Sequence, residues 1–362
     1  MSIKDLLAPR YHIADDKPTG IGGQKFFYLA KDTYLDRQVA VKVPKDAATL
    51  NALHKEVAKV SLVSSKHVVK CLDQIKENGK AIAIVEEYIT GFLLKDLDHS
   101  GMNLEAILRL LYQIAQGLVD IHSAGLVHRD ITPSNLKIDD EGVLKILDFG
   151  IASFSFDDRT EIGRGTFAYK APEVFARPMQ PKPEVDIYSF GVIAHLLFSQ
   201  GNLCGEFARG ALRQKIAPPP PFNSFSVLDD DHALCDLLEA CIAHDPQQRP
   251  TSIALRDALR ARLTQGKHSA LLTSQSLENA IVINQSKSAA KITFPGQNPL
   301  TIQYNGLEYN ITSWPNECYI NGRLVNAEIS LQRSCIISIG SPAKGSSRHF
   351  ITFDISQPEI VF

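Results

Sequence analysis

The stretch His128-Arg129-Asp130-Ile131-Thr132-Pro133-Ser134-Asn135, followed thirteen residues later by Asp148-Phe149-Gly150, decides the fold of this chain. Its central polar residues are an acid, an amide and a second acid: Asp130, Asn135 and Asp148. An amide and a carboxylate are suitable oxygen ligands for a divalent cation, and a further carboxylate can orient a hydroxyl group. Two short motifs in this order, with supporting residues on both sides, seldom arise by chance. They predict one cleft that holds a hydroxyl group beside metal-bound phosphates.

The composition is that of a globular protein without a nucleic-acid footprint. With 362 residues the chain is too long for one ordinary core, which predicts two or three domains. Its formal net charge of −2 argues against a nucleic-acid partner. No apolar run approaches the roughly 20 residues of a membrane span, and the first residues do not resemble a signal peptide. Six cysteines without ligand spacing are expected to be free thiols, so we expect a cytoplasmic protein.

Apolar periodicity predicts a strand-rich half followed by a helix-rich half. Strands are expected over residues 26–30, 39–43 and 81–85, with one helix between them over 50–60. From Asn103, a suitable N-cap, to Gly125, where a helix should stop, the period is helical. Further helices are expected at about 184–199, 208–216, 231–243 and 252–264. This order of elements predicts an enzyme of two lobes with its site between them.

A separate β domain is predicted at the C-terminal end. Around residues 266–279 the periodicity fades into polar residues, which indicates a linker. Short apolar strands follow, and Asn305-Gly306 and Asn321-Gly322 are strong hairpin signals because both residue types tolerate positive φ. Residues 280–362 are therefore expected to form a small β-sandwich.

Between residues 11 and 263 the chain resembles the eukaryotic-type (Hanks-type) serine/threonine protein kinase family, and its bacterial members most of all. The likeness rests on the two motifs above, on Val39-Ala40-Val41-Lys42, and on the segment that ends in Ala171-Pro172-Glu173. It implies an α+β, bilobal protein-kinase fold, with a β-rich N-lobe and a helical C-lobe, plus the all-β sandwich. The domains expected are the N-lobe over 1–89, the C-lobe over 90–265, a linker over 266–279 and the sandwich over 280–362.

The resemblance also implies the chemistry. Kinases of this family transfer the γ-phosphate of ATP to serine or threonine hydroxyls of protein substrates, with Mg²⁺, or Mn²⁺ in its place, as the metal. It implies that Asp130 orients the hydroxyl and accepts its proton, and that Asn135 and Asp148 hold metal ions. Lys42 would bind the α- and β-phosphates and pair with Glu56, whose charge on an apolar helix stripe needs an opposite charge nearby.

The phosphate end of the expected site departs from the family. Gly20-Ile21-Gly22-Gly23 resembles the first half of the glycine-rich loop over the phosphates, although a plain hairpin is the alternative. Lys25 stands where the family has its third loop glycine, so the phosphate cover is looser or Lys25 itself reaches the nucleotide. Thr132 replaces the lysine that the family carries two residues after the catalytic aspartate. Because a hydroxyl cannot neutralise the developing charge, we expect a lower turnover.

The hinge between the lobes is expected at Glu87-Tyr88-Ile89, where the backbone of Glu87 and Ile89 would hold adenine. Glu86 stands at the gatekeeper position, where the family prefers an apolar or small residue. Its carboxylate could bond Lys42, meet a polar edge of adenine or narrow the pocket. The residue type leaves these three options open.

Residues with structural roles in the family are also in place: His128, Arg129, Phe149, Gly150, Glu173, Asp186 and Arg249. Glu173 is expected to pair with Arg249, and Asp186 to brace the backbone of the catalytic loop. Arg129 is expected to be an exposed cation that pairs with a phosphorylated activation segment. The candidate autophosphorylation sites are Thr160 and Thr166, with Ser153 and Ser155 behind them.

Residues 318–325, 335–340 and 350–354 resemble the second half of a forkhead-associated (FHA) domain. Such domains bind phosphothreonine peptides through an arginine and a serine in earlier loops. Neither is evident here, since the first strand ends in Asn284-Gln285 and no Ser-Arg-x-His run follows. The alternatives are a degenerate FHA domain that binds a protein or phosphopeptide partner, and a plain β-sandwich that docks on the kinase or on another protein.

A nucleotide-binding pseudokinase scaffold is the main alternative to an active enzyme. Thr132, Lys25 and Glu86 favour the scaffold, whereas the complete pair of motifs favours the enzyme. A small-molecule phosphotransferase of the same fold is a third option. It is disfavoured because Ala171-Pro172-Glu173, which shapes a platform for a peptide, is intact.

Overall fold

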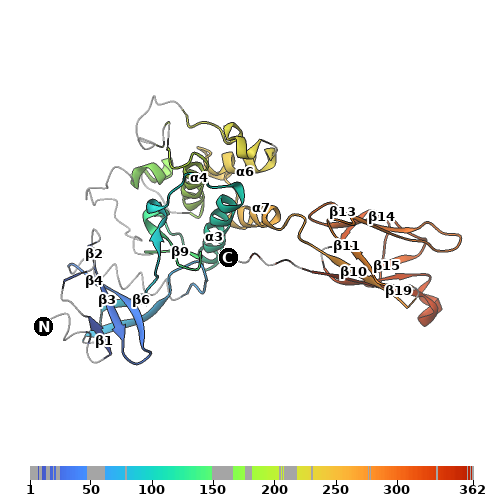
Figure 1. The fold of residues 1–362 in the computed structure, drawn as a ribbon, viewed down its shortest axis with the longest axis horizontal. Helices are drawn as coiled ribbons and strands as arrows, with labels where there is room; N and C mark the ends of the chain where they lie inside the picture. The colour runs from blue at the N-terminus through green and yellow to red at the C-terminus, as the bar shows by residue number, and fades with distance from the viewer. Residues whose placement is uncertain are drawn as a thin grey trace. The chain divides into compact units, whose positions relative to one another are not determined.

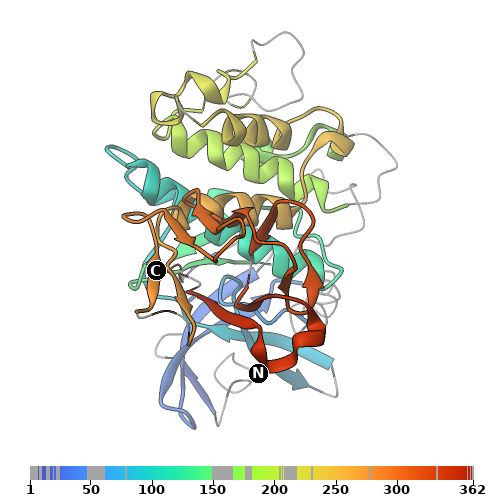
Figure 2. The ribbon, with the colours of Figure 1, turned by 90° about the vertical axis from the view of Figure 1, so that its right-hand side faces the viewer.

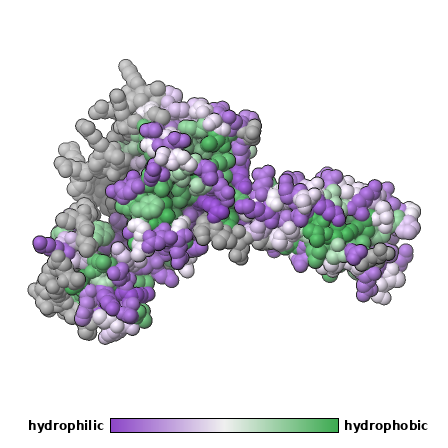
Figure 3. All heavy atoms as spheres, viewed as in Figure 1, coloured by the Kyte–Doolittle hydropathy of each residue, from purple (hydrophilic) through white to green (hydrophobic). Residues whose placement is uncertain are grey.

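The computed structural model divides into two compact units, residues 1–259 and 260–361. It describes the chain apart from residues 1–6, 8–9, 14–16, 19, 22–24, 47–61, 78–79, 149–165, 176–181, 204, 206, 208–217, 230, 276, 278, 332, 357, 359 and 361–362. The first unit contains a small β lobe and a helical lobe, and the second consists of strands (Figure 1). Polar residues cover much of the visible surface of each unit, interrupted by apolar patches (Figure 3).

The N-lobe of the first unit is an antiparallel sheet. Its strands are β1 (Tyr11–Ile13), β2 (Gly20–Ile21), β3 (Lys25–Asp32), β4 (Arg37–Pro44), β5 (Cys71–Glu77) and β6 (Lys80–Glu87). The order across the sheet is β1-β3-β4-β6-β5, and β2 pairs with β3. The predicted strands at 26–30, 39–43 and 81–85 correspond to β3, β4 and β6, whereas the helix predicted over 50–60 lies outside the described residues.

Strand alternation gives this sheet one core face and one face for the site. Val39 and Val41 of β4 are fully buried in the core of the lobe. Lys42 follows them on the opposite face, directly across from Phe27 of β3. Glu86 of β6 pairs with the β4 position two residues before Lys42. Lys42, Phe27 and Glu86 therefore share one face, and all three line the same cavity.

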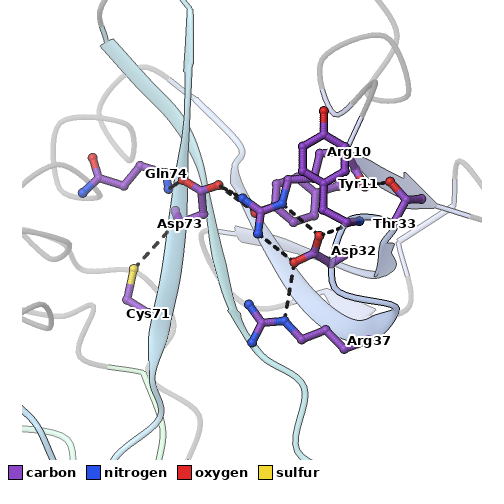
Figure 4. A network of polar contacts seen from close by, with 9 residues as sticks. Arg10, Tyr11, Asp32, Thr33, Arg37, Cys71, Asp73 and Gln74 are labelled. Atoms are coloured by element: carbon purple, nitrogen blue, oxygen red, sulfur yellow. Dashed lines mark hydrogen bonds and ion pairs between the residues drawn. The ribbon is translucent and has the colours of Figure 1, made fainter.

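A cluster of charges ties the N-terminal segment to β3 and to the edge strand β5 of this sheet (Figure 4). Arg10 donates Nε and Nη2 to the two carboxylate oxygens of Asp32, each at 2.8 Å, and Nη1 to Asp73 Oδ2 at 3.0 Å. The Tyr11 hydroxyl donates to the same Asp73 oxygen at 2.7 Å, and Arg37 Nε lies 3.4 Å from Asp32 Oδ2. The hydrogen bonds from Arg10, opposed in part by burial, lower the pKa of Asp32 to about 2.

The C-lobe is built on α3 (Leu104–Ser123), α4 (Glu184–Phe198), α6 (His232–Cys241) and α7 (Ser252–Thr264). These match the predicted helices, apart from the one at 208–216, which lies outside the described residues. Asn103 caps α3 as predicted, since its Oδ1 accepts the N–H of Ala106 at 2.9 Å, and Gly125 has φ 73 just beyond the helix. α4 is buried on nearly every side, and α3 and α4 lie side by side in both views (Figures 1 and 2).

Short strands and 3₁₀ turns hold the motif residues between the lobes. β7 (Phe92–Leu93), β8 (Leu136–Ile138) and β9 (Leu144–Ile146) form a small sheet. The first motif ends in η2 (Pro133–Asn135), directly before β8, and Asp148 follows β9. Val68 forms a parallel bridge with Ile146, which joins the N-lobe chain to β9. The other 3₁₀ turns of this unit are η1 (Leu94–Asp96), η3 (Thr166–Tyr169), η4 (Pro172–Phe175), η5 (Phe222–Ser224), η6 (Ser226–Leu228) and η7 (Pro246–Gln248).

The second unit is a sandwich of two antiparallel sheets around an apolar core. One sheet has the order β11 (Ile281–Ile283), β10 (Ala270–Thr273), β19 (His349–Ile355), β18 (Cys335–Ile339), β15 (Cys318–Ile320) and β16 (Arg323–Leu324). The other has the order β12 (Ala289–Ile292), β13 (Leu300–Tyr304), β14 (Tyr309–Ser313) and β17 (Ile329–Leu331), and η8 (Pro342–Ser347) precedes β19. Asn321 and Gly322, with φ of 48° and 81°, form the predicted two-residue turn between β15 and β16.

The segment 266–279, predicted as a linker, contains a strand of the sandwich. Ala270 and Leu272 of β10 are buried, and β10 pairs with β11 on one side and β19 on the other. Four residues are too few for alternation to stand out among polar neighbours. The main partner, β19, lies at the far end of the chain, so local sequence carries little signal for this strand.

Among the described residues, no helix is both long enough and apolar enough to cross a membrane. The cysteines in the same part of the chain are free thiols: Cys71, Cys235, Cys241, Cys318 and Cys335.

Replacing Asp32 with Asn is expected to destabilise the N-lobe, because Arg10 and Arg37 lose the carboxylate between them. The pKa of Asp32 is about 2 in the folded protein, so its contribution is complete above about pH 4 and is lost as the pH falls towards 2. Thermal melts should give a Tm for Asp32→Asn a few degrees below wild type at pH 7. That difference should narrow between about pH 4 and about pH 2.

The control for this experiment is Asp36→Asn. Asp36 lies in the turn after β3, is 83% exposed and pairs with Lys31, so its loss should change the Tm little. Equal shifts for the two variants at pH 7 would contradict a special role for the buried carboxylate.

Candidate active site

The first motif folds so that Asn135 turns back on Asp130. Asn135 Nδ2 donates to the backbone oxygen of Asp130 at 2.9 Å and to its carboxylate oxygen Oδ2 at 2.8 Å. Since both amide hydrogens are used here, the oxygen Oδ1 of Asn135 is the atom available to a cation. The other carboxylate oxygen, Asp130 Oδ1, is buried and has no hydrogen-bond partner among the described residues. Such an atom is costly to bury, which indicates a site for a donor from another molecule.

Asp186, in the first turn of α4, holds the backbone of this loop. Its buried carboxylate accepts the N–H of His128 at 2.8 Å and that of Arg129 at 2.7 Å, and lies 3.0 Å from His122 Nε2. These are the contacts expected of Asp186. Arg129 has φ 69, a left-handed conformation that is uncommon for a residue other than glycine. The hydrogen bonds from the N–H groups of His128 and Arg129 to Asp186 stabilise this conformation.

Arg129 was predicted to be exposed, and this is wrong. Its side chain is partly buried, because the bonds to Asp186 draw its backbone against α4, and burial lowers its pKa. Arg129 therefore lies deeper in the fold than a cation on an open loop.

The second motif is hydrogen-bonded to the first. The N–H of Leu147 donates to the backbone oxygen of Asn135 at 2.8 Å, and His128 Nε2 donates to the oxygen of Leu147 at 2.9 Å. Asp148 follows with φ 57, a second left-handed residue. Both backbone groups of Leu147 are thus hydrogen-bonded to the first motif, directly before the turn that presents the Asp148 carboxylate.

A cavity of about 290 Å³ lies between the lobes. It is lined by residues from the sheet and the hinge, among them Ala40, Lys42, Glu86, Glu87, Tyr88 and Ile89, and by C-lobe residues, among them Leu93, Ser134, Asn135, Lys137, Leu147 and Asp148. The hinge and the two candidate metal ligands therefore face one space. The N–H of Glu87 donates to Lys70 O at 3.0 Å, which joins the hinge to the chain before β5.

Lys42, Glu86 and Asp148 line this cavity, and together with Lys25 they form a cluster of two lysines and two carboxylates. Lys42 Nζ lies 2.9 Å from Glu86 Oε2 and 3.4 Å from Asp148 Oδ1, and Lys25 Nζ lies 3.2 Å from the same Asp148 oxygen. The side chains of Lys42, Glu86 and Lys25 are each less than a tenth exposed. The charge of Lys42, assisted by Lys25 and opposed by burial, holds the pKa of Asp148 well below its usual range.

Of the three options for Glu86, the structure shows the bond to Lys42. Glu56, predicted as the partner of Lys42, lies outside the described residues. The sequence could not choose between the options for Glu86 because the choice depends on the register of β4 and β6, which brings the two side chains onto one face.

The sequence analysis missed a clamp on the hinge. Lys145 Nζ donates to both carboxylate oxygens of Glu87, at 2.8 and 2.7 Å, and the N–H of Lys70 donates to Glu87 Oε1 at 2.8 Å. Lys145 lies across from Lys137 in the β8–β9 hairpin, and each lysine stands between two buried apolar residues. This repeated Leu-Lys-Ile pattern was the available signal for two lysines on one face of the hairpin, opposite its buried apolar residues.

The predicted ion pair between Glu173 and Arg249 is present. Arg249 donates Nη1 and Nη2 to the two oxygens of Glu173, at 2.6 and 2.9 Å. Its Nη1 also donates to the backbone oxygen of Glu184 at 3.0 Å, and its Nε to that of Ala243 at 2.9 Å. A buried guanidinium with this many acceptors anchors the Ala171-Pro172-Glu173 segment to the start of α4.

Several predicted site residues cannot be placed. Gly22, Gly23, Glu56, Phe149, Gly150 and Thr160 lie outside the described residues, as do Ser153 and Ser155. Gly20 and Ile21 are described as strand β2, and Thr166 begins η3, without a description of their side chains.

A comparison with known families identifies this arrangement. The family model described as protein kinase domain matches residues 14–262. The chain belongs to this family. The predicted fold class, a bilobal kinase fold with an all-β C-terminal domain, is confirmed.

Curated relatives are bacterial kinases. The chain is 36% identical over 262 residues to the serine/threonine-protein kinases drp72 of Corynebacterium efficiens, a match over 68% of this chain and 49% of the relative. It is 31% identical over 306 residues to the serine/threonine-protein kinase PknL of Mycobacterium tuberculosis, over 78% and 76% of the two chains. For a probable serine/threonine-protein kinase of Clostridium acetobutylicum the identity is 30% over 262 residues, 68% of this chain and 39% of the relative. The chain thus spans about half, or less, of two of these proteins.

Protein kinases use ATP and a divalent metal ion, and the residues of this cavity fit both. Asn135 Oδ1 and the ionised carboxylate of Asp148 are oxygen donors, and both residues line the cavity. In the described part of the chain, no group of three or more His, Cys, Asp and Glu side chains is arranged to hold a metal. A kinase metal site does not need one, because phosphate oxygens and water complete the shell of the ion.

Glu86→Gln should weaken the charge cluster, because buried Lys42 keeps its charge and loses the carboxylate 2.9 Å from its Nζ. We expect the free energy of unfolding to fall by roughly 3 kcal/mol in denaturant titrations, and nucleotide affinity to fall with it. Glu77→Gln, an exposed glutamate at the end of β5, is the matched control and should behave as wild type. If Glu86→Gln and Glu77→Gln are equally stable, the pair does not hold Lys42.

Proposed function

We propose that this chain is an active protein kinase that transfers the γ-phosphate of ATP to serine or threonine hydroxyls of proteins. The observation that carries the proposal is the buried oxygen Oδ1 of Asp130, which has no hydrogen-bond partner among the described residues and shares its loop with Asn135. A substrate hydroxyl supplies the donor that this oxygen lacks. A protein that only bound nucleotide would gain nothing from burying it.

In the proposed step the substrate hydroxyl oxygen bonds to the γ-phosphorus while the bond from that phosphorus to the bridging oxygen of ADP breaks. The bridging oxygen keeps the electron pair, and the hydroxyl proton passes to the carboxylate of Asp130. Asn135 Nδ2 holds Asp130 Oδ2 at 2.8 Å, so the carboxylate cannot rotate freely. Asn135 thereby orients the base as well as offering an oxygen to the metal.

We propose Mg²⁺ as the metal, held by Oδ1 of Asn135 and the carboxylate of Asp148. When bound, the ion would supply positive charge that neutralises the phosphates. Lys42 and Lys25 support this role, because they hold the pKa of Asp148 low and so keep its carboxylate ionised at any physiological pH. The position of Lys42 between Glu86 and Asp148 suits contact with the α- and β-phosphates.

Other features stay predictions of the sequence. They include adenine binding by the backbone of Glu87 and Ile89, autophosphorylation of Thr160 and Thr166, and the absence of a nucleic-acid partner. The domain boundaries, the FHA resemblance, and recruitment or regulation through a protein or phosphopeptide bound to the sandwich also remain predictions, as does a cytoplasmic location.

The proposal is tested by incubating the purified full chain with γ-labelled ATP, Mg²⁺ and a general acceptor protein. Wild type should label the acceptor on serine or threonine, as phosphoamino-acid analysis would show. Asp130→Asn should lower the rate about 10²- to 10⁴-fold, because it removes the base and leaves the nucleotide site intact. Asp140→Asn, an exposed aspartate in the turn after β8, is the control and should match wild type.

The rival function is a scaffold that binds nucleotide without transferring phosphate. Nucleotide binding by the wild type, with no label transferred by either wild type or Asp130→Asn, would favour that scaffold over the enzyme.

A further inference from the structure

Lys25 stands at the start of β3, on the face of the sheet that carries Lys42. In the β3–β4 register Lys25 pairs with Pro44, and Phe27 pairs with Lys42. Since Lys25 and Phe27 are two residues apart on one strand, both share the face of Lys42. Lys25 is only 7% exposed, and its Nζ lies 3.2 Å from Asp148 Oδ1. The ammonium group of Lys25 therefore contacts Asp148, the candidate metal ligand, in addition to that of Lys42.

A divalent cation on Asp148 would compete for the oxygen that Lys25 contacts. Lys42 also contacts Glu86, whose Oε2 lies 2.9 Å from its Nζ. The ammonium of Lys25 would be repelled by the metal ion and attracted by the phosphate oxygens in the shell of that ion. The shift needed is small, since these oxygens would lie next to the Asp148 carboxylate.

The catalytic loop carries no lysine of its own. Thr132 is 6% exposed and uncharged, and the run from His128 to Asn135 contains no lysine. Lys137 also lines the cavity, but its Nζ lies 5.6 Å from the ring centre of Tyr88, at the hinge end. Lys25 is thus the cation that the N-lobe adds to Lys42 near Asp148.

We propose that Lys25 binds the β- and γ-phosphates of ATP and supplies, from the N-lobe, the positive charge that Thr132 cannot supply from the catalytic loop. This assignment rests on the function proposed above and extends it to one further substrate-binding residue. Lys25 neutralises charge on the transferred phosphate and takes no part in proton transfer.

Calorimetric titration of the full chain with two ligands tests this assignment: the magnesium complex of AMP-PNP, which has three phosphates, and AMP, which has one. Lys25→Met should raise the Kd for AMP-PNP about tenfold or more and change the Kd for AMP less than about twofold. Lys25→Arg keeps the charge and should stay within about threefold of wild type for both ligands. Lys31→Met, on the same strand with its side chain 60% exposed, is the control and should match wild type.

Equal changes in the two affinities, or none, would overturn the assignment and leave Lys25 as a structural partner of Asp148. A thermal melt shows whether each variant is folded. If Lys25→Met is not folded, Lys25→Gln takes its place, because glutamine can still donate a hydrogen bond to Asp148. Its Kd values for AMP-PNP and AMP are then measured in the same way. The titration needs no phosphate transfer, so a failure of the labelling experiment and a failure of Lys25 are separate results.

Discussion

The ion pairs of Lys42 and Lys25 with Asp148 are the interaction on which the nucleotide site depends. Both lysines come from the N-lobe sheet, whereas Asp148 follows β9 of the C-lobe, so these pairs cross between the lobes. Removing one charge from a buried set of this kind leaves another without a partner, at a cost of several kcal/mol. The same cavity wall therefore sets the spacing of the lobes and the positions of the groups that would meet the phosphates.

Backbone geometry is the second constraint, and it is local to the two motifs. Arg129 and Asp148, with φ of 69° and 57°, both adopt a left-handed conformation that costs an ordinary residue about 1–2 kcal/mol. Asp186 stabilises the first, and the hydrogen bonds of Leu147 with Asn135 and His128 stabilise the second. Unfavourable conformations persist only where surrounding contacts determine them, and they gather at functional sites. Here both fall beside the residues that would do the chemistry.

How much of this could be predicted follows from the range of each contact. Asn135 reaches Asp130 over five residues, so the motif spacing alone predicts that they meet. The contact of Asp186 with the catalytic loop spans 58 residues and the Glu173–Arg249 pair spans 76, and both were expected only through the family resemblance. The family resemblance predicted no contact for Lys145, whose ion pair with Glu87 was therefore not expected.

The features that the sequence did not yield depend on tertiary pairing. β10 is stabilised by β19, a strand from the end of the chain. The ion pair between Glu87 and Lys145 spans 58 residues. The ion pair between Glu86 and Lys42 depends on the register of β4 and β6. Arg129 was predicted to be an exposed cation that pairs with a phosphorylated activation segment, and its exposure was wrong because Asp186 of α4 holds the backbone of that loop. In each case the missing information was which surface a residue would be packed against, and local propensity does not contain it.

Three residues depart from the family pattern: Thr132, Lys25 and Glu86. Each of these departures changes a charge of the candidate site. Thr132 removes a positive charge from the catalytic loop, and Lys25 adds one within 3.2 Å of Asp148. Glu86 adds a negative charge 2.9 Å from Lys42, which keeps that lysine paired when a metal ion engages Asp148. Lys25 thus offsets the positive charge that Thr132 removes, and Glu86 gives Lys42 a carboxylate besides Asp148, so both lysines stay charged beside the candidate metal ligand. That arrangement favours phosphate chemistry in this cavity over scaffolding.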